Sequence, residues 1–267
     1  MIYALEAELF RLRRRPQTRV VLVLVGLLVG LFYAINYVVF ALGNMTEAET
    51  AEVMVPEAIM SVGIETFEFT AFILAVVVAS GLIGAEYEWN TLRPLVARAR
   101  SRSALLSAKW LTVVVVTVLI TVVGVASAIL YSILGSILIG AEIGVSGDLL
   151  VSLLQGIVFH FVALLPYPVI AFSVALLTRS NAAGVALGVG MRFMEPLVLQ
   201  VLGSVAKAMQ DAQQWGIAWN VQQLNSYASN HVSSGELWRS IGILTAYCSI
   251  LVIATYLVFT RRDITSG

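Results

Sequence analysis

Six long apolar runs constrain the fold of this chain more than any other feature of its sequence. A transmembrane helix needs about 20 consecutive, mostly apolar residues, and runs of that length recur from one end of the chain to the other. Only 12% of the residues are charged, whereas a soluble domain carries about a quarter. No polar stretch reaches the roughly 40 residues that an independent domain needs. We therefore predict one all-α integral membrane domain over residues 1–267.

The polar stretches between the runs set the limits of six expected transmembrane helices. The spans are predicted at residues 20–42, 69–84, 104–133, 149–177, 182–205 and 237–260. Pro166 and Pro168 should kink or break the fourth span, because proline interrupts the helical hydrogen-bond ladder. Gly26 and Gly30 form a GxxxG pair in the first span, a pattern that allows close approach of a second helix.

The basic residues predict the orientation of the chain. Thirteen of the sixteen Lys and Arg residues lie in four segments: 1–19, 85–109, the turn at 178–181 and the stretch after 260. Ten of the sixteen acids lie in the segments on the opposite side. Short loops rich in Lys and Arg stay in the cytoplasm, so we expect both termini to be cytoplasmic, which an even number of spans satisfies.

Residues 1–19 are expected to form an amphipathic helix in the plane of the lipid headgroups. Apolar side chains line one helical face: Ile2, Leu5, Leu9 and Leu12. A plain positively charged anchor is a compatible alternative, because four arginines gather before Pro16. On the opposite side, residues 206–237 are rich in Trp and Tyr, which favours the membrane interface. Whether this outer segment re-enters the membrane stays open.

The loop at residues 85–109, between the second and third spans, has an ordered charge pattern. Its acids Glu86 and Glu88 come first, and its basic residues follow: Arg93, Arg98, Arg100, Arg102 and Lys109. An apolar face is spaced as in a helix by Leu92, Leu95, Val96 and Ala99. Pro94 is tolerated in a first helical turn. We predict a short cytoplasmic helix that docks on a partner.

Three polar residues inside the predicted spans are candidates for a transport pathway, because an ionisable residue within a membrane marks a functional site by default. For His160 the alternative is a neutral histidine satisfied by a neighbouring helix, and this is the interpretation that we favour. Arg192 and Glu195 are three residues apart, so they can pair across one helical turn. That pair is either a polar gate or a self-neutralising pair, and Pro196 would then end a half-helix.

The sequence offers no catalytic or cofactor site. A GxxxxGK[ST] phosphate-binding loop is absent, so no nucleotide is expected on this chain. Gly184, Gly188 and Gly190 lie inside the fifth span with no strand before them, which favours close helix packing. Cys248 is the only cysteine and the methionines lack the spacing of ligands. We expect no enzyme activity, no metal and no nucleic-acid partner.

The loop at 85–109 resembles the intracellular loop of ABC-2 type transporter permeases. The matching elements are Glu86, Glu88, Thr91-Leu92-Arg93, Leu95-Val96, Ser101-Arg102 and Ala108-Lys109. Asn90 replaces the glycine that the family usually has before the threonine, and asparagine shares some of glycine's tolerance for turns. In its layout the whole chain is most similar to the six-span permeases of the bacitracin-export and copper-maturation type.

The resemblance implies a division of labour between two kinds of subunit. In this family a separate ABC ATPase binds ATP and Mg, and two copies of it receive the short intracellular helices in their clefts. Two permease copies, here expected as a homodimer, form an export pathway in the plasma membrane of a prokaryote. Residues 1–19 would be the connecting helix. The implied ATPase contacts are Glu86, Glu88, Leu92, Arg93, Leu95, Val96, Arg98 and Arg102.

Three other interpretations are weighed against the exporter. The same ATPase-coupled motor could act mechanically, as a platform that extracts or presents a lipid or a protein. An ion-coupled secondary transporter could use His160 or the Arg192–Glu195 pair, but it would require internal repeats, and none is visible between residues 20–134 and 149–260. An intramembrane enzyme would need a nucleophile–base pair, which the sequence does not offer.

Overall fold

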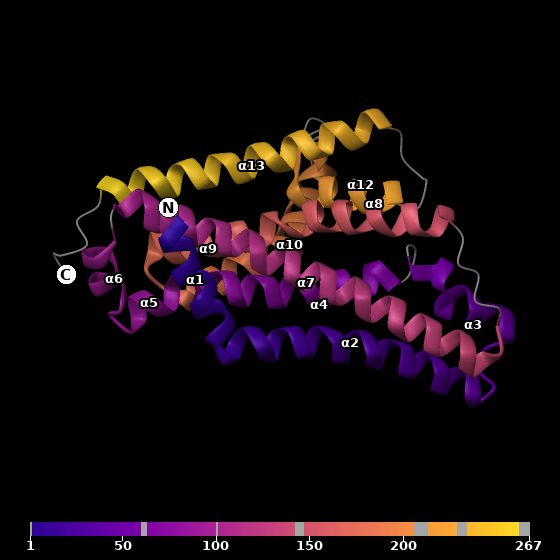
Figure 1. The fold of residues 1–267 in the computed structure, drawn as a ribbon. Helices are drawn as coiled ribbons and strands as arrows, with labels where there is room; N and C mark the ends of the chain where they lie inside the picture. The colour runs from indigo at the N-terminus through magenta and orange to yellow at the C-terminus, as the bar shows by residue number, and fades with distance from the viewer. Residues whose placement is uncertain are drawn as a thin grey trace.

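The computed structural model describes residues 2–59, 63–99, 101–141, 147–205, 213–228 and 234–261. In this part of the chain all regular structure is helical, and six helices are long and apolar enough to cross a membrane. Most of them run side by side in one elongated bundle (Figure 1). The prediction of an all-α membrane protein with six spans is therefore confirmed.

The helices follow the predicted spans, with shifted boundaries. They are α1 Ile2–Arg14, α2 Pro16–Ala41, α3 Glu47–Met54, η1 Pro56–Ile59, α4 Gly63–Gly81, α5 Gly84–Glu88, α6 Leu92–Arg98, α7 Arg102–Ile139, α8 Gly147–Leu164, α9 Pro166–Thr178, α10 Asn181–Val205, η2 Gln213–Trp215, α12 Ile217–Ala228 and α13 Ser234–Arg261. The third span, α7, extends beyond its predicted limits at both ends. The predicted loop at 85–109 is correspondingly shorter, because its last residues belong to α7.

The amphipathic N-terminal helix ends earlier than predicted. It was expected over residues 1–19, but α1 stops at Arg14, Arg15 is extended and Pro16 opens α2. Proline lacks an N–H and has a fixed φ, so it suits the first turn of a helix and not its interior. The break lets α1 pack against α7 instead of continuing along α2. Glu8 and Leu12 are buried on its inner face.

The two proline predictions have different outcomes. The fourth span is divided at Leu165 into α8 and α9, as the prolines at its centre predict. The fifth span, by contrast, does not end at Pro196, because α10 continues through it to Val205. In a membrane the backbone groups must be satisfied within the segment, so the helix persists although proline removes one of its hydrogen bonds.

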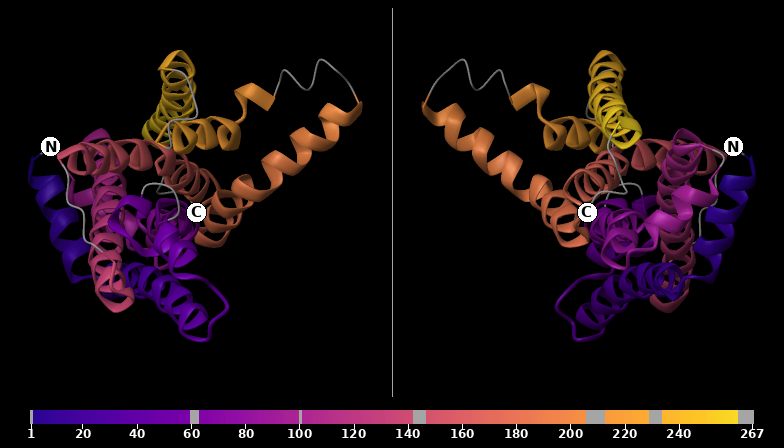
Figure 2. Two further views of the ribbon diagram at one scale, coloured as in Figure 1. Left: turned by 90° about the vertical axis from the view of Figure 1, so that its right-hand side faces the viewer. Right: turned by 90° about the vertical axis from the view of Figure 1, so that its left-hand side faces the viewer.

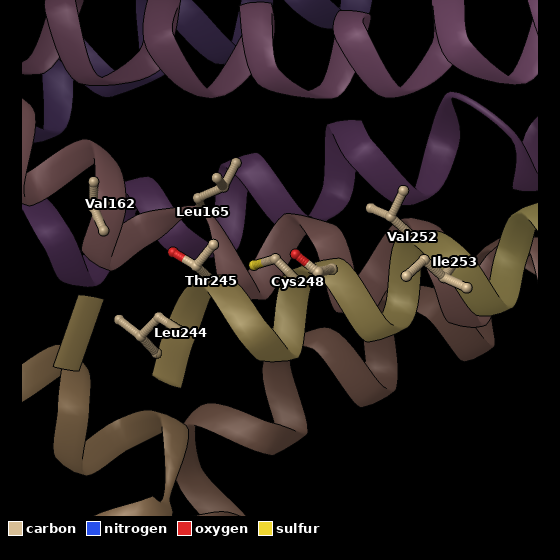
Figure 3. Close-up of a pocket in the computed structure, with 8 residues that line it drawn as sticks. Val162, Leu165, Leu244, Thr245, Cys248, Val252 and Ile253 are labelled. Atoms are coloured by element: carbon tan, nitrogen blue, oxygen red, sulfur yellow. The ribbon is translucent and has the colours of Figure 1, made fainter. Parts of the chain in front are cut away.

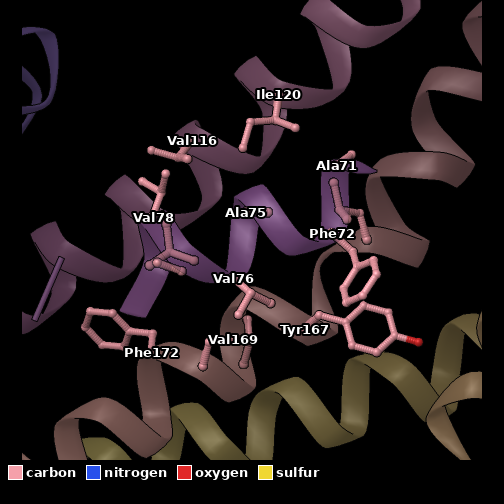
Figure 4. Packing of buried hydrophobic residues seen from close by; sticks show 14 of the residues in the cluster. Ala71, Phe72, Ala75, Val76, Val78, Val116, Ile120, Tyr167, Val169 and Phe172 are labelled. Carbon is pink, nitrogen blue, oxygen red and sulfur yellow. The ribbon is translucent and has the colours of Figure 1, made fainter. Parts of the chain in front are cut away.

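The second span lies at the centre of the packing. Together with the fourth span it is the most buried of the six. Figure 4 shows apolar side chains of α4, including Val76 and Val78, between those of α7 and α9. Phe72 of α4 lies beside Tyr167 of α9, with ring centroids 5.6 Å apart. Because α4 is packed on these neighbours, a displacement of α4 would also displace the spans around it.

Glycines set the closest helix contacts. A Cβ atom at Gly30 would lie 2.6 Å from the ring of Tyr131, so the GxxxG pair does bring α2 against α7. Gly184 of α10 likewise approaches the carbonyl oxygen of Ala171, at 2.6 Å from its virtual Cβ, and Gly188 is similarly close to Val76. The expectation of close packing holds for these glycines, whereas Gly190 faces open space.

We call the end of the bundle that carries α3 the acidic end. Here the segment after Thr46 forms α3, and Pro56 opens the short 3-10 helix η1. Met54 is buried against Gly135 of α7, in keeping with a core role for this methionine. In the other half, α10 leans outward from the bundle and α12 lies beside α13 (Figure 2).

The predicted outer segment at 206–237 is described in part. It contains η2, α12 and the start of α13, whereas Met209 and His231 lie outside the described residues. α12 buries Val221 and Leu224 and leaves Trp219 exposed. This pattern is that of a helix with one face on the protein.

Candidate functional site

The end of the bundle opposite α3 brings together α1, α5, α6 and the turn between α9 and α10 (Figure 1). We call it the basic end, because exposed arginines surround it: Arg13, Arg14, Arg19, Arg93, Arg98 and Arg179. The predicted coupling loop lies here. Its structure determines which of the predicted contact residues can meet a partner.

The loop consists of two short helices joined at Asn90. This residue has a φ of 53°, a left-handed conformation that asparagine adopts more readily than most residues. Asn90 thus adopts the kind of turn conformation that was expected of it. Pro94 lies in the first turn of α6, as predicted. Because the turn redirects the chain, Trp89 is left 72% exposed just before it.

The apolar face predicted for docking is turned toward the chain's own core. Leu92 is only 2% exposed, and Leu95 and Val96 are half-buried against the same core. Such a short helix holds its position by burying its own apolar face. Leu92 thus packs on the chain's own core, and its contact with a partner stays a prediction.

Buried charges anchor the loop. Lys109 of α7 is fully buried, and its Nζ lies 2.7 Å from Glu86 Oε2 and 3.5 Å from Glu8 Oε1. The same nitrogen donates to the carbonyl oxygen of Leu82 at 3.0 Å. Arg15 Nη2 lies 3.4 Å from the other Glu86 oxygen. We call Glu8, Arg15, Glu86 and Lys109 the basic-end clasp.

The clasp explains why charges can lie in this position. A buried ammonium group is tolerated only when carboxylates and hydrogen-bond acceptors surround it. The four side chains come from α1, the α1–α2 link, α5 and α7, so each element is fixed relative to the others. Glu86, which we predicted to contact a partner, is 3% exposed and faces this interior instead. Its contact with a partner stays a prediction.

A second set of contacts joins the loop to the start of α10. Glu88 Oε1 accepts a hydrogen bond from the backbone N–H of Asn181 at 3.1 Å. Ser80 Oγ donates to the carbonyl oxygen of the same residue at 2.8 Å. The Arg179 guanidinium lies over the Tyr87 ring, 6.0 Å from its centroid. The loop is thus held by the fifth span as well as by the third.

A polar cleft of about 270 Å³ opens between the loop and this turn. Its lining residues are Glu86, Tyr87, Glu88, Asn90, Leu92, Arg93 and Arg179. Arg93 and Arg98 of the predicted contact set are exposed, and Arg102 is the half-buried first residue of α7. Carboxylates inside and arginines at the edge suit an interface with charged and polar groups of another protein.

Two residues that the structure places at this site were not among the sequence predictions. Glu8 is a single acid on the otherwise apolar side of α1, and that position signals a buried partner for a cation. Trp89 is a large aromatic residue in a loop of acids and arginines. Tryptophan and arginine are enriched in the hot spots of protein interfaces. Lys109 was recognised only as a basic residue of the loop, and its burial depends on tertiary contacts.

The polar residues predicted for the spans form a separate centre. The expected pair of Arg192 with Glu195 is not formed. Instead, Arg192 Nη2 lies 3.1 Å from Glu68 Oε1, and Arg192 Nη1 donates to the Tyr167 hydroxyl at 3.0 Å. Glu195 instead accepts the backbone N–H groups of residues 217 and 218 at the start of α12, at 2.6 and 2.9 Å. The spacing along α10 permits a pair between Arg192 and Glu195. Arg192 pairs with Glu68 instead, because the buried Glu68 carboxylate needs a cation beside it.

His160 is 1% exposed, in α8, and within electrostatic range of Arg192. Its place among the neighbouring helices agrees with a buried structural histidine, and a role in transport stays a prediction. No group of three or more His, Cys, Asp and Glu side chains is placed to hold a metal among the residues that the structure describes.

An apolar groove of about 380 Å³ lies where the α8–α9 break faces α13 (Figure 3). Its lining is Val162, Leu165, Leu244, Thr245, Cys248, Ser249, Val252 and Ile253. No acid or base is among these residues. The groove can accommodate an apolar chain, but it offers no group for catalysis or for binding a charged ligand, so the basic end remains the candidate site.

Comparison with known families agrees with the geometry. The sequence profile of a family described as "ABC-2 family transporter protein" matches residues 4–195, which include α1, the basic-end clasp and the first four spans. No curated protein matches the chain. Members of this family are membrane components of transporters that normally work with an ABC ATPase. The chain therefore belongs to the ABC-2 family of transporter proteins, as a membrane-spanning permease.

Proposed function

We propose that this chain is the membrane subunit of an ATP-driven exporter in a prokaryotic plasma membrane. Two copies would form the pathway as a homodimer, and a separate ABC ATPase, also in two copies, would dock on the basic end and bind ATP and Mg. The observation that carries the proposal is the basic-end clasp. It ties the loop between spans 2 and 3 to buried charges of α1 and α7, so that a force on the loop reaches the spans.

The proposed orientation places the basic end in the cytoplasm. Exposed arginines crowd this end, whereas Glu47, Glu49 and Glu52 are exposed on α3 at the opposite end. Arginine-rich loops are retained on the cytoplasmic side. Both α1 and the C-terminal end of α13 lie at the basic end in Figure 1, so both termini would be cytoplasmic, next to the ATPase.

The contact surface that we propose differs from the predicted apolar face. Trp89, Arg93, Arg98 and Arg179 are exposed around the polar cleft. Tryptophan and arginine dominate the energetics of many interfaces, because they bury a large area and carry directional donors. Glu86, Leu92 and Lys109 would act through the position of the loop and not by touching the ATPase.

The transport cycle follows from this arrangement. ATP binding would close the two ATPases and displace the two docked loops. Because the clasp and the Glu88–Asn181 contact fix each loop to α1, α7 and α10, the displacement would shift the populations of inward-facing and outward-facing states. Such a shift requires the ATP-bound ATPase to bind one of the two states more tightly than the other.

The experiment is an association measurement with a matched control. Trp89→Ala removes the exposed aromatic at the basic end, and Trp238→Ala removes one of equal exposure at the start of α13, 72% against 69%. Each variant is purified with the ABC ATPase that co-purifies with the wild-type chain. We expect Trp89→Ala to weaken association by at least tenfold and Trp238→Ala to leave it unchanged. Equal association of the two variants would contradict the proposed docking surface.

A further inference from the structure

A second charged centre lies within the spans, away from the basic end. Glu68 of α4 is 2% exposed and pairs with Arg192 of α10 at 3.1 Å. The Arg192 guanidinium also donates a hydrogen bond from Nη1 to the hydroxyl of Tyr167 in α9, at 3.0 Å. The amide of Asn225 in α12 donates to the second oxygen of Glu68. The Glu68 carboxylate thus joins three helices directly, and Arg192 connects it to a fourth, α9.

This centre lies at the point where α10 departs from the bundle. α10 is the least buried of the six spans, and in Figure 2 it leans outward from the others. Before Arg192, Gly184 and Gly188 hold it tightly against α9 and α4. After Arg192, its apolar side chains are mostly exposed, among them Leu197 and Val201. The ion pair is therefore at the boundary between a fixed half and a projecting half.

The physics of a charge in a membrane makes such a pair a two-state element. Separating Glu68 from Arg192 leaves two charges in an apolar medium, which is costly unless water or a polar cargo replaces the partner. The pair is stable when closed, and it is also stable when opened into a hydrated pathway. Intermediate separations without water are disfavoured, so the contact behaves as a switch and not as a gradual spring.

The same span reaches both charged centres. Glu68 lies near one end of the second span and Glu86 of the basic-end clasp lies at the other. From Glu68 to Gly81, α4 supplies about 20 Å of helix axis at 1.5 Å per residue, and residues 82 and 83 then lead into α5, which carries Glu86. In this span α4 is packed on α7 and α9 with Ala71, Ala75 and Ala79 fully buried. The packed helix and the turn into α5 thus connect the loop to the ion pair.

We propose that the Glu68–Arg192 ion pair is a latch that holds α10 against α4 at the base of its projecting half, and that the segment from Glu68 to Glu86 transmits displacement of the basic end to it. The transmission half of this proposal rests on the proposed function of the loop. The latch half stands on the contacts of the pair alone.

The latch is tested by the rate of cross-linking between two neighbouring positions. Phe69 and Phe193 follow the two charged residues, and their rings are 6.1 Å apart. With Phe69→Cys and Phe193→Cys in a Cys248→Ser background, the full chain is reconstituted in lipid nanodiscs without an ATPase. A short bis-methanethiosulfonate reagent then joins the two thiols, and mass spectrometry separates cross-links within one chain from those between chains.

We expect Glu68→Gln and Arg192→Gln each to slow cross-linking within the chain by at least tenfold. The charge swap Glu68→Arg with Arg192→Glu should restore the rate to within about threefold of the parent. Tyr167→Phe, which removes only the hydroxyl, should slow it a few-fold. Glu52→Gln, in the exposed acidic face of α3, is the matched control and should leave the rate unchanged.

Loss of folding would also slow cross-linking. The charge-swap variant and Tyr167→Phe distinguish loss of folding from loss of the latch. A neutral variant that melts like the parent but cross-links at the parental rate would overturn the latch. So would a swap that fails to recover the rate while Tyr167→Phe also has no effect. Both results are independent of ATPase docking, so they leave the Trp89 test untouched.

Transmission is tested by a change at the far end of the same span. Glu86→Gln in the same cross-linking background is expected to change the rate at Phe69 and Phe193 several-fold, although Glu86 lies toward the other end of the second span. Glu6→Gln, an exposed acid of α1 at the same end, is the control and should have no effect. An unchanged rate in Glu86→Gln would overturn transmission along the span, even with the latch confirmed.

Discussion

Lys109 Nζ lies 2.7 Å from Glu86 Oε2, and both side chains are almost completely buried. This contact joins the third span to the loop that resembles the coupling loop of ABC-2 permeases. It is therefore the point at which the stability of the fold and the proposed transmission of force meet.

The clasp predicts a strong dependence of stability on a single lysine. Lys109→Met removes the cation while leaving Glu8 and Glu86 buried, so it should cost about 3–5 kcal/mol, as expected for one partner of a buried pair. Thermal unfolding of the purified chain in detergent measures this effect. The double variant Lys109→Met with Glu86→Gln should lose less than the two single variants combined, because they share one interaction. Strict additivity would argue against the clasp.

Packing of α10 predicts opposite effects of one substitution at two glycines. Gly184→Ala places a Cβ atom 2.6 Å from the Ala171 carbonyl oxygen and should destabilise by about 1–3 kcal/mol through overpacking. Gly190→Ala meets no atom within 4 Å and should be neutral or stabilising by up to about 1 kcal/mol, from helix propensity. Melting temperatures of the two variants decide this. The same shift in both would mean that α10 does not pack as described.

The bonds from Glu195 predict local opening of α12. Its carboxylate accepts the first two N–H groups of that helix, those of Ile217 and Ala218. Glu195→Ala leaves these donors without their partner, so the first turn of α12 should open more easily by about 1–2 kcal/mol, as for loss of an N-cap. Hydrogen–deuterium exchange measures the opening. Exchange in α3 serves as an internal control, and faster exchange in both helices would indicate global destabilisation instead.

The acidic end carries a pH-dependent cap. Hydrogen bonds from the Thr46 backbone and side chain lower the pKa of Glu49 below its usual value. A lowered pKa means that the cap contributes stability above the ordinary glutamate pKa and loses it as the pH falls through the lowered value. Amide exchange in α3, corrected for its intrinsic pH dependence, should therefore rise over that acidic range. Glu49→Gln should remove this dependence, and its persistence would contradict the capping role.

The fold was predictable from sequence because lipid imposes simple rules on a chain. Apolar runs of sufficient length specify spans, and proline specifies breaks, as Leu165 before Pro166 shows. The error at Pro196 has the same origin, because the requirement to satisfy the backbone within the membrane outweighs the break. The N-terminal helix is shorter than the predicted 1–19 because Pro16, which suits a first helical turn, opens α2 and α1 ends at Arg14.

The candidate site was predictable in its location but not in its contacts. Charge order and helical spacing identified the loop at 85–109, and its Asn90 turn and Pro94 start are as expected. The same spacing could not show whether Leu92 faces a partner or the chain's own core, since an apolar face satisfies both. Nor could it pair Arg192 with Glu68, which is far away in sequence. Such partners are fixed only by tertiary packing.

The central claim is that an ABC ATPase engages the basic end through the loop between spans 2 and 3. Its most direct test replaces Trp89 by the photo-reactive p-benzoylphenylalanine and irradiates membranes that contain the chain and its co-purifying ATPase. Trp238, similarly exposed at the start of α13, carries the same probe as a control. The account predicts a covalent adduct with the ATPase from position 89 and none from position 238. An adduct from position 238 with none from position 89 would contradict it.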